Sequence, residues 1–138
     1  MYLDKELFVW TKDRDEPKFK IKGYESETLK GLSFVGISWR KANQIHSWFV
    51  KNVQDGEDNC REYGVSVDQL KELYDSVCKV LANHDLSEEL LPTRDGFFFG
   101  GTDYDEYYYK DLEFTKTELE KLFAADKDNF DYSYRSSW

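Results

Sequence analysis

The most regular pattern of apolar positions in the chain lies between residues 67 and 81. Apolar residues recur there every three or four positions, the period of a helix with one buried face: Val67, Leu70, Leu73, Tyr74, Val77 and Leu81. Just before them, Ser66 is followed three residues later by Gln69, the spacing of a capping box. The pattern predicts a helix that begins after Ser66 and ends near residues 83–85.

A second helix is predicted from Trp39 to about Asn52, with Ser38 as its N-cap. Steps of about 100° per residue place seven residues on one face: Trp39, Ala42, Asn43, His46, Phe49, Val50 and Val53. Trp48 falls on the opposite side. Either both faces of this helix are covered, or Trp48 is presented to a partner.

A third helix is predicted over residues 104–123. Thr102 or Asp103 offers an N-cap, with an acidic residue three positions further on. Its packed side is expected to contain seven residues: Tyr104, Tyr107, Tyr108, Leu112, Thr115, Leu119 and Leu122. Residues 86–91 are expected to form a short packed segment or helical turn that Pro92 stops.

Three short runs of aromatic and branched apolar residues predict strands at 7–10, 32–37 and 97–99. The charged stretch of residues 12–30 is expected to be a loop or hairpin, in which residues 18–22 form an edge strand protected by lysines. These elements predict an α+β fold. About three helices and a small antiparallel sheet would form a single domain over residues 1–123. An acidic, aromatic C-terminal tail, residues 124–138, either packs on that domain or stays mobile.

The net charge of the chain argues against direct binding to nucleic acids or membranes. The chain has 138 residues, of which 28 are acidic and 19 basic, for a net charge of −9. This excess repels phosphate backbones and anionic membrane surfaces. No apolar run approaches the roughly 18 residues that span a membrane, and the N-terminus lacks the order of a signal peptide. We therefore expect a soluble, intracellular protein that binds neither nucleic acid nor membranes directly.

The sequence offers little support for a metal site. The two cysteines, Cys60 and Cys78, lack the paired spacing of structural zinc. Two acidic clusters carry oxygen ligands but do not match a calcium-binding loop: Asp55, Glu57 and Asp58, and Asp103, Asp105 and Glu106. We expect no metal or other cofactor.

A polar set within the first predicted helix is the best candidate for ligand binding. His46 and Asn43 lie one turn apart, with Arg40 at their edge. They either hydrogen-bond a neighbouring strand or loop, or form with Arg94 a pocket for a ligand. No spacing brings together a nucleophile, a base and an orienting group, so no catalytic residue is assigned. A hydrolase that uses His46 with an acidic metal site is the least favoured alternative.

Contacts to a partner protein are predicted on aromatic and acidic residues. Three consecutive tyrosines, residues 107–109, point in different directions on a helix, so at least one must face outward. The predicted contact residues are Trp48, Asp55, Asp58, Asp105, Tyr108 and Tyr109.

Two long strings resemble a family of small bacteriophage and prophage proteins that has no established activity. They are WRKANQIHSWFVKNVQDG, residues 39–56, and LLPTRDGFFFGGTDYDEYY, residues 90–108; the likeness covers roughly residues 32–123. The resemblance implies a phage-encoded protein of the host cytoplasm. By analogy with accessory phage proteins, we expect it to capture or inhibit a host or defence protein. The alternative is a protein that binds or sequesters a small, nucleotide-type molecule.

Overall fold

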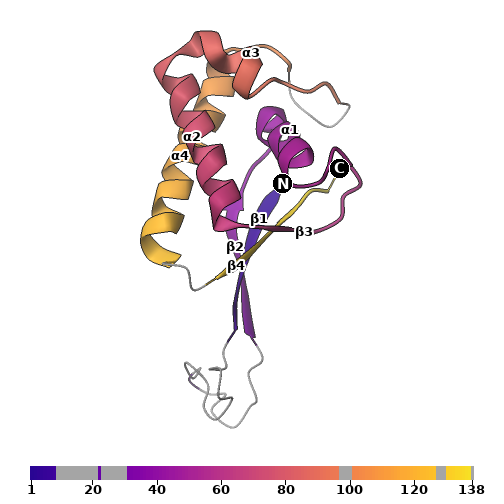
Figure 1. Ribbon diagram of the computed structural model, residues 1–138, viewed down its shortest axis with the longest axis vertical. Helices are drawn as coiled ribbons and strands as arrows, with labels where there is room; N and C mark the ends of the chain where they lie inside the picture. The colour runs from indigo at the N-terminus through magenta and orange to yellow at the C-terminus, as the bar shows by residue number, and fades with distance from the viewer. Residues whose placement is uncertain (9–21, 23–30, 97–100, 127–129, 138) are drawn as a thin grey trace.

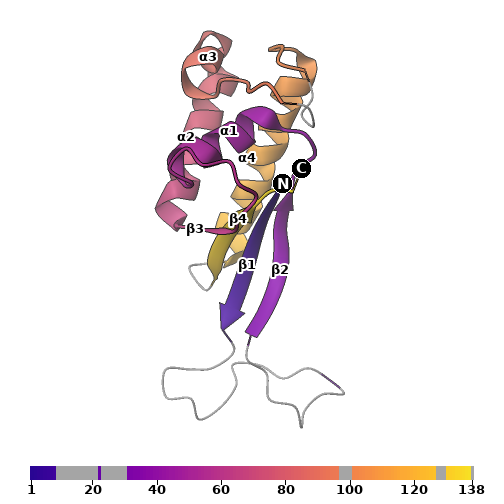
Figure 2. The ribbon, with the colours of Figure 1, turned by 90° about the vertical axis from the view of Figure 1, so that its right-hand side faces the viewer.

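The computed structural model contains a four-stranded sheet and helices that pack against it (Figures 1 and 2). It describes residues 1–8, 22, 31–96, 101–126 and 130–137. The elements in chain order are β1 (Tyr2–Phe8), β2 (Gly31–Ser38), α1 (Asn43–Asn52), β3 (Tyr63–Val65), α2 (Val67–Ala82), the 3-10 helix η1 (His84–Leu86), α3 (Ser87–Leu90), α4 (Glu106–Asp126) and β4 (Asp131–Arg135). The predicted α+β class is confirmed.

The sheet is antiparallel with strand order β2-β1-β4-β3. Strand β4 therefore lies inside the sheet, between β1 and β3, and the two tyrosines Tyr132 and Tyr134 are buried. Residues 124–126 end α4 and residues 131–135 form this inner strand, so the described part of the predicted C-terminal tail packs within the domain. The alternation of polar and aromatic residues in β4 is the pattern of a strand with one buried face.

The two faces of the sheet differ in character. On the inner face, the Tyr134 ring stacks on Phe49 of α1 with centroids 3.9 Å apart, and the Tyr132 hydroxyl donates to Asp126 of α4. On the outer face, Arg135 pairs with Asp4. One packed and one polar face is usual for an antiparallel sheet, and the core lies between the inner face and the helices.

Helix α1 begins four residues later than predicted. Ser38 is the last residue of β2 rather than a cap, and the Trp39 N–H donates to the Met1 carbonyl. Lys41 then has a positive φ of 59°, which is incompatible with a right-handed helix, so α1 begins only at Asn43. Trp39 and Trp48 are both buried. Of the two alternatives for Trp48, the structure therefore has the helix covered on both faces.

Helix α2 forms as its pattern predicts. The Ser66 hydroxyl accepts from the Gln69 N–H, and the Gln69 side chain accepts from the Ser66 N–H, so both halves of the capping box are present. The Gln69 amide also donates to the Asn52 carbonyl, which fixes the start of α2 against the end of α1. Leu70, Leu73 and Val77 are fully buried.

Helix α4 is capped differently and is longer than predicted. The Asp105 carboxylate accepts from the Tyr108 N–H at 3.1 Å, so Asp105, rather than Thr102 or Asp103, caps the helix. The helix continues to Asp126, and its buried side contains most of the expected residues. Two expected residues differ: Tyr104 lies before the helix begins, and 75% of the surface of Tyr107 is exposed.

Several other predicted elements can be compared only in part. Strand β2 confirms the prediction for residues 32–37, and β1 covers the first half of the predicted strand at 7–10. Residues 86–91 form the end of η1, helix α3 and the buried Leu91. The predicted strand at 97–99 and nearly all of the charged stretch 12–30, including its edge strand, lie outside the described residues.

Replacing Tyr134 tests the inner position of β4. Tyr134→Ala removes a fully buried ring and its stack on Phe49, so we expect the free energy of unfolding to fall by about 3–5 kcal/mol. Asp131→Ala, on an exposed position of the same strand, is expected to change it by about 0.5 kcal/mol or less. Urea unfolding followed by circular dichroism measures both. Equal effects of the two variants would contradict the structure.

Candidate functional site

Asn43, at the first position of α1, joins two distant parts of the chain. Its side chain is buried; the amide nitrogen donates to the Gly101 carbonyl at 3.1 Å, and the oxygen accepts from the Arg94 N–H at 3.0 Å. These two bonds hold Arg94 and Gly101, two points of the segment between α3 and α4, against α1. The hydrogen-bonding groups of Asn43 are thus occupied by the protein's own backbone, as the first of its two predicted roles requires.

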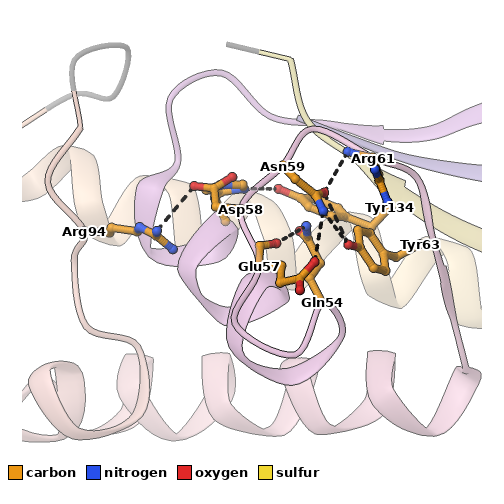
Figure 3. Close-up of polar contacts among 9 residues, drawn as sticks. Gln54, Glu57, Asp58, Asn59, Arg61, Tyr63, Arg94 and Tyr134 are labelled. Atoms are coloured by element: carbon orange, nitrogen blue, oxygen red, sulfur yellow. Dashed lines mark hydrogen bonds and ion pairs between the residues drawn. The ribbon is translucent and has the colours of Figure 1, made fainter.

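His46 lies one turn further along α1 and is fully buried. Its Nδ1 is 2.7 Å from the Tyr134 hydroxyl, and its Nε2 is 3.0 Å from Oδ1 of Asp58. The other Asp58 oxygen lies 3.4 Å from the Arg94 guanidinium. Figure 3 shows Arg94, Asp58 and Tyr134 in this row. We call Arg94, Asp58, His46 and Tyr134 the His46 network; it joins four separate segments of the chain.

The charges of the network follow from its burial. Removal from water lowers the pKa of His46, and the Asp58 carboxylate opposes this only in part. The imidazole is therefore neutral at pH 7. Because a carboxylate only accepts, Asp58 favours a proton on Nε2, which leaves Nδ1 to accept from the Tyr134 hydroxyl. Burial likewise raises the pKa of Tyr134, so that hydroxyl keeps its proton.

This geometry gives the His46 network a structural role. A general base must reach the proton that it removes, but no part of His46 is open to solvent, and both of its ring nitrogens face protein groups. The same burial argues against His46 as a contact for a ligand. Within the described part of the chain, no group of three or more histidine, cysteine or acidic residues is arranged to hold a metal ion.

A surface cleft of about 360 Å³ lies where the N-terminal ends of α1 and α4 meet the segment between α3 and α4. Most of its lining comes from the two strings that carry the phage resemblance, and two further residues follow the second string. The lining residues are Arg40, Lys41, Asn43, Gln44, Thr93, Gly101, Asp103, Asp105, Tyr107, Tyr108, Lys110 and Asp111. Of the four predicted ligand residues, Arg40 and Asn43 line this cleft, whereas His46 and Arg94 belong to the network beside it.

The cleft carries both signs of charge. Arg40 and Lys41 are exposed, and neither forms an ion pair within the described residues. Opposite charges come from Asp105 and Asp111. Burial raises the pKa of Asp111, the Gln44 side chain lowers it, and the neighbouring Asp105 carboxylate raises it. Such a cleft can receive a group that bears both an anionic and a cationic part.

The predicted partner contacts do not form one surface. Trp48 and Tyr108 are only 7% and 4% exposed, so the prediction that they present their rings to a partner is wrong. The Tyr108 hydroxyl donates to the Leu91 carbonyl inside the core. Both rings belong to the hydrophobic core, which contains residues of the sheet as well as of the helices, and the helical period alone could not show that this core covers them.

The other four predicted contacts are scattered. Tyr109 is half-buried; its ring stacks on His84 at 3.8 Å, and its hydroxyl lies 3.1 Å from that of Ser87. Asp58 belongs to the His46 network, and Asp105 caps α4 at the cleft. Asp55 is exposed in the turn after α1, where its φ is 52°.

One of the three consecutive tyrosines does face outward, but it is Tyr107 and not Tyr108 or Tyr109; sequence reasoning did not single out Phe114, the other aromatic side chain that α4 exposes. Tyr107 is 75% and Phe114 is 42% exposed. They lie seven residues apart and so share one face of the helix; we call this pair the α4 aromatic stripe. Phe114 does not belong to the packed side predicted for this helix. The sequence therefore already indicated that its ring is exposed. Tyr107 is assigned to the packed side because the predicted packed side covers a wider angle around the helix axis than the face that α4 actually buries.

Comparisons with protein families, curated proteins and solved structures find no match to this chain. Among the described residues, no helix has both the length and the apolar character needed to cross a membrane.

Acidification tests the burial of His46. Its pKa is lowered in the folded chain, so as pH falls through about 6.5 the unfolded chain takes up the proton first, and the folded state loses stability. We expect the free energy of unfolding to drop more between pH 7 and pH 5.5 in the wild type than in His46→Asn, which does not titrate. Urea unfolding across this range measures the difference. Parallel pH profiles would contradict the inferred burial.

Proposed function

We propose that this protein acts by non-catalytic binding of another protein, through the α4 aromatic stripe and the cleft beside it. The observation that carries the proposal is the exposure of Tyr107 and Phe114 on one face of α4. Exposed aromatic rings are frequent anchors of protein interfaces, because they bury a large area and have few side-chain torsions to fix. Tyr107 belongs to both features, since it also lines the cleft.

Charge around the stripe supports a protein partner. Lys110 lies over the Tyr107 ring, with its Nζ 5.7 Å from the ring centroid, and Arg40 and Lys41 are exposed across the cleft. Asp103 and Asp105 supply acceptors in the same cleft. A partner that presents both basic and acidic side chains beside an apolar patch fits this surface. Because the chain carries −9 overall, basic partners are favoured at long range.

The resemblance to phage and prophage proteins supports a particular kind of partner. We propose a host or defence protein in the host cytoplasm, whose basic surface normally contacts nucleic acid. Capture of that surface would inhibit it by occupying the site. The proposal of a host or defence protein as the partner rests on analogy with other accessory phage proteins.

The stripe can be tested with a double variant. Tyr107→Ala combined with Phe114→Ala removes both proposed anchors, and we expect the affinity for the partner to fall at least tenfold, roughly 1.4 kcal/mol. The partner would first be identified as a stoichiometric component in native mass spectrometry of tagged protein from infected host cells. Calorimetry with the purified pair then measures affinity.

Thr117→Ala is the matched control, because it truncates an exposed residue of the same helix outside the stripe. It is expected to leave the affinity unchanged. A partner that binds the double variant as tightly as the wild type would exclude the stripe as its contact surface.

The cleft itself favours a second candidate function, binding of a small molecule. Its volume of about 360 Å³ lies within the range of small-molecule sites, about 300–1,000 Å³. A nucleotide-type ligand would place its anionic group at Arg40 and Lys41 and its ring against Tyr107. His46 and Arg94 do not take part in this version.

This second candidate predicts a mass excess of a few hundred daltons in native spectra, lost on denaturation. Arg40→Ala is expected to abolish the excess, because it removes an exposed cation from the cleft. Arg61→Ala removes an exposed arginine outside the cleft and is expected to keep it. An adduct that survives Arg40→Ala would have to lie elsewhere.

A further inference from the structure

The wall of the cleft that α4 forms carries a carboxylate beside two exposed aromatic rings. Asp111 lines the cleft and lies four residues after Tyr107 and three residues before Phe114. Residues three and four apart are neighbours on a helix surface, so this carboxylate adjoins the α4 aromatic stripe. A group that binds Asp111 from the cleft therefore also lies against the proposed partner surface.

Asp111 is partly removed from water, and its charge is met by an amide rather than by a cation. It is half-buried, and none of the ion pairs between described residues includes it. Burial raises the pKa of Asp111, the buried Gln44 side chain lowers it, and the nearby Asp105 carboxylate raises it. A carboxylate with little water and a like charge beside it gains more from an added cation than an exposed carboxylate does.

Asp105 places a second carboxylate in the same cleft. Its Oδ1 accepts from the Tyr108 N–H at 3.1 Å, which fixes the side chain at the start of α4. Within the part of the chain that the structure describes, its Oδ2 has no hydrogen bond or ion pair. Two acceptors close together can share one planar group that carries several donors.

The Tyr107 ring is placed to attract a positive charge. Lys110 Nζ lies 5.7 Å from the ring centroid, while the same ammonium pairs with Glu106. Aromatic faces attract ammonium and guanidinium groups, and arginine is found over them more often than lysine. Because Tyr107 is 75% exposed, it keeps surface for a second cationic side chain.

We propose that the cleft receives an arginine side chain of the partner protein, with its guanidinium at Asp111 and Asp105 and its aliphatic stem along Tyr107. This inference rests on the proposed function, because the arginine belongs to the protein that the α4 aromatic stripe contacts. A guanidinium presents its N–H donors in one plane, so it can bond two carboxylates and stack on a ring, whereas a lysine ammonium is a point charge. Arginine is also a frequent anchor of protein interfaces.

The basic residues of the cleft determine where the guanidinium lies. Arg40 and Lys41 directly precede α1, and both are exposed. Like charges repel, so these two residues disfavour a cation near α1 and favour the wall formed by α4. The net charge of −9 adds long-range attraction for a basic partner.

A small probe tests the site without the partner. N-acetyl-arginine amide carries one guanidinium and no other charge, and N-acetyl-citrulline amide has nearly the same shape without the charge. We expect the arginine probe to bind with a dissociation constant of roughly 1 mM and to shift the amide NMR signals of Gln44, Tyr107 and Asp111. The citrulline probe and N-acetyl-lysine amide should bind roughly tenfold more weakly or less.

Three variants test the role of the carboxylates. Asp111→Asn keeps the shape of the side chain without its charge, and we expect it to weaken the arginine probe roughly tenfold or more. Asp105→Ser removes the other charge but keeps a residue that caps helices, and should weaken the probe as well. Asp75→Asn, on an exposed position of α2 outside the cleft, is the matched control and should leave the probe affinity unchanged. Circular dichroism checks that each variant is folded.

Three results would overturn the proposal: no saturable shift with the arginine probe, equal binding of the arginine probe and either comparison probe, or a folded Asp111→Asn chain that binds as the wild type does. The first two use the wild-type chain, so they stand even where a variant does not fold. The proposed function is tested separately by the Tyr107→Ala and Phe114→Ala double variant. If that variant loses the partner while Asp111→Asn keeps full affinity for it, the stripe is the contact surface and the arginine site is excluded.

Discussion

Burial of polar side chains on α1 is the constraint on which the rest of the structure depends. Asn43, Gln44 and His46 are almost completely removed from water. A buried polar group without a partner costs about 1–3 kcal/mol, so each must be satisfied within the protein. Asn43 bonds the segment before α4, Gln44 donates to the Tyr108 carbonyl in α4, and His46 meets β4 and Asp58. Through these bonds, α1 fixes the position of each segment around it.

Because the buried polar side chains of α1 are used for internal contacts, they are not accessible to a binding partner. The polar residues that stand out in the sequence are occupied by internal contacts, and Trp48 is buried among apolar neighbours. What remains for a partner is the rim: Arg40 and Lys41 just before the helix, and the exposed side of α4. Residues that shape the cleft therefore differ from those that would contact what enters it. Asn43 contributes to both, because the bonds it makes hold one wall of the cleft in place.

Several elements of this fold depend on local interactions, and these elements could be predicted from the sequence alone. The capping box at Ser66, the periodic apolar face of α2 and the strand at residues 32–37 depend on residues close together in the chain. Tertiary structure alone decided the rest. Strand β4 alternates polar and aromatic residues, which is the pattern of a strand, but its position inside the sheet depends on pairing with β1 and β3, which are distant in the sequence. His46 is structural because Tyr134 and Asp58, distant in sequence, reach it. Periodicity shows which residues share a face; only the packed chain decides what covers that face, since the covering groups come from elsewhere in the sequence.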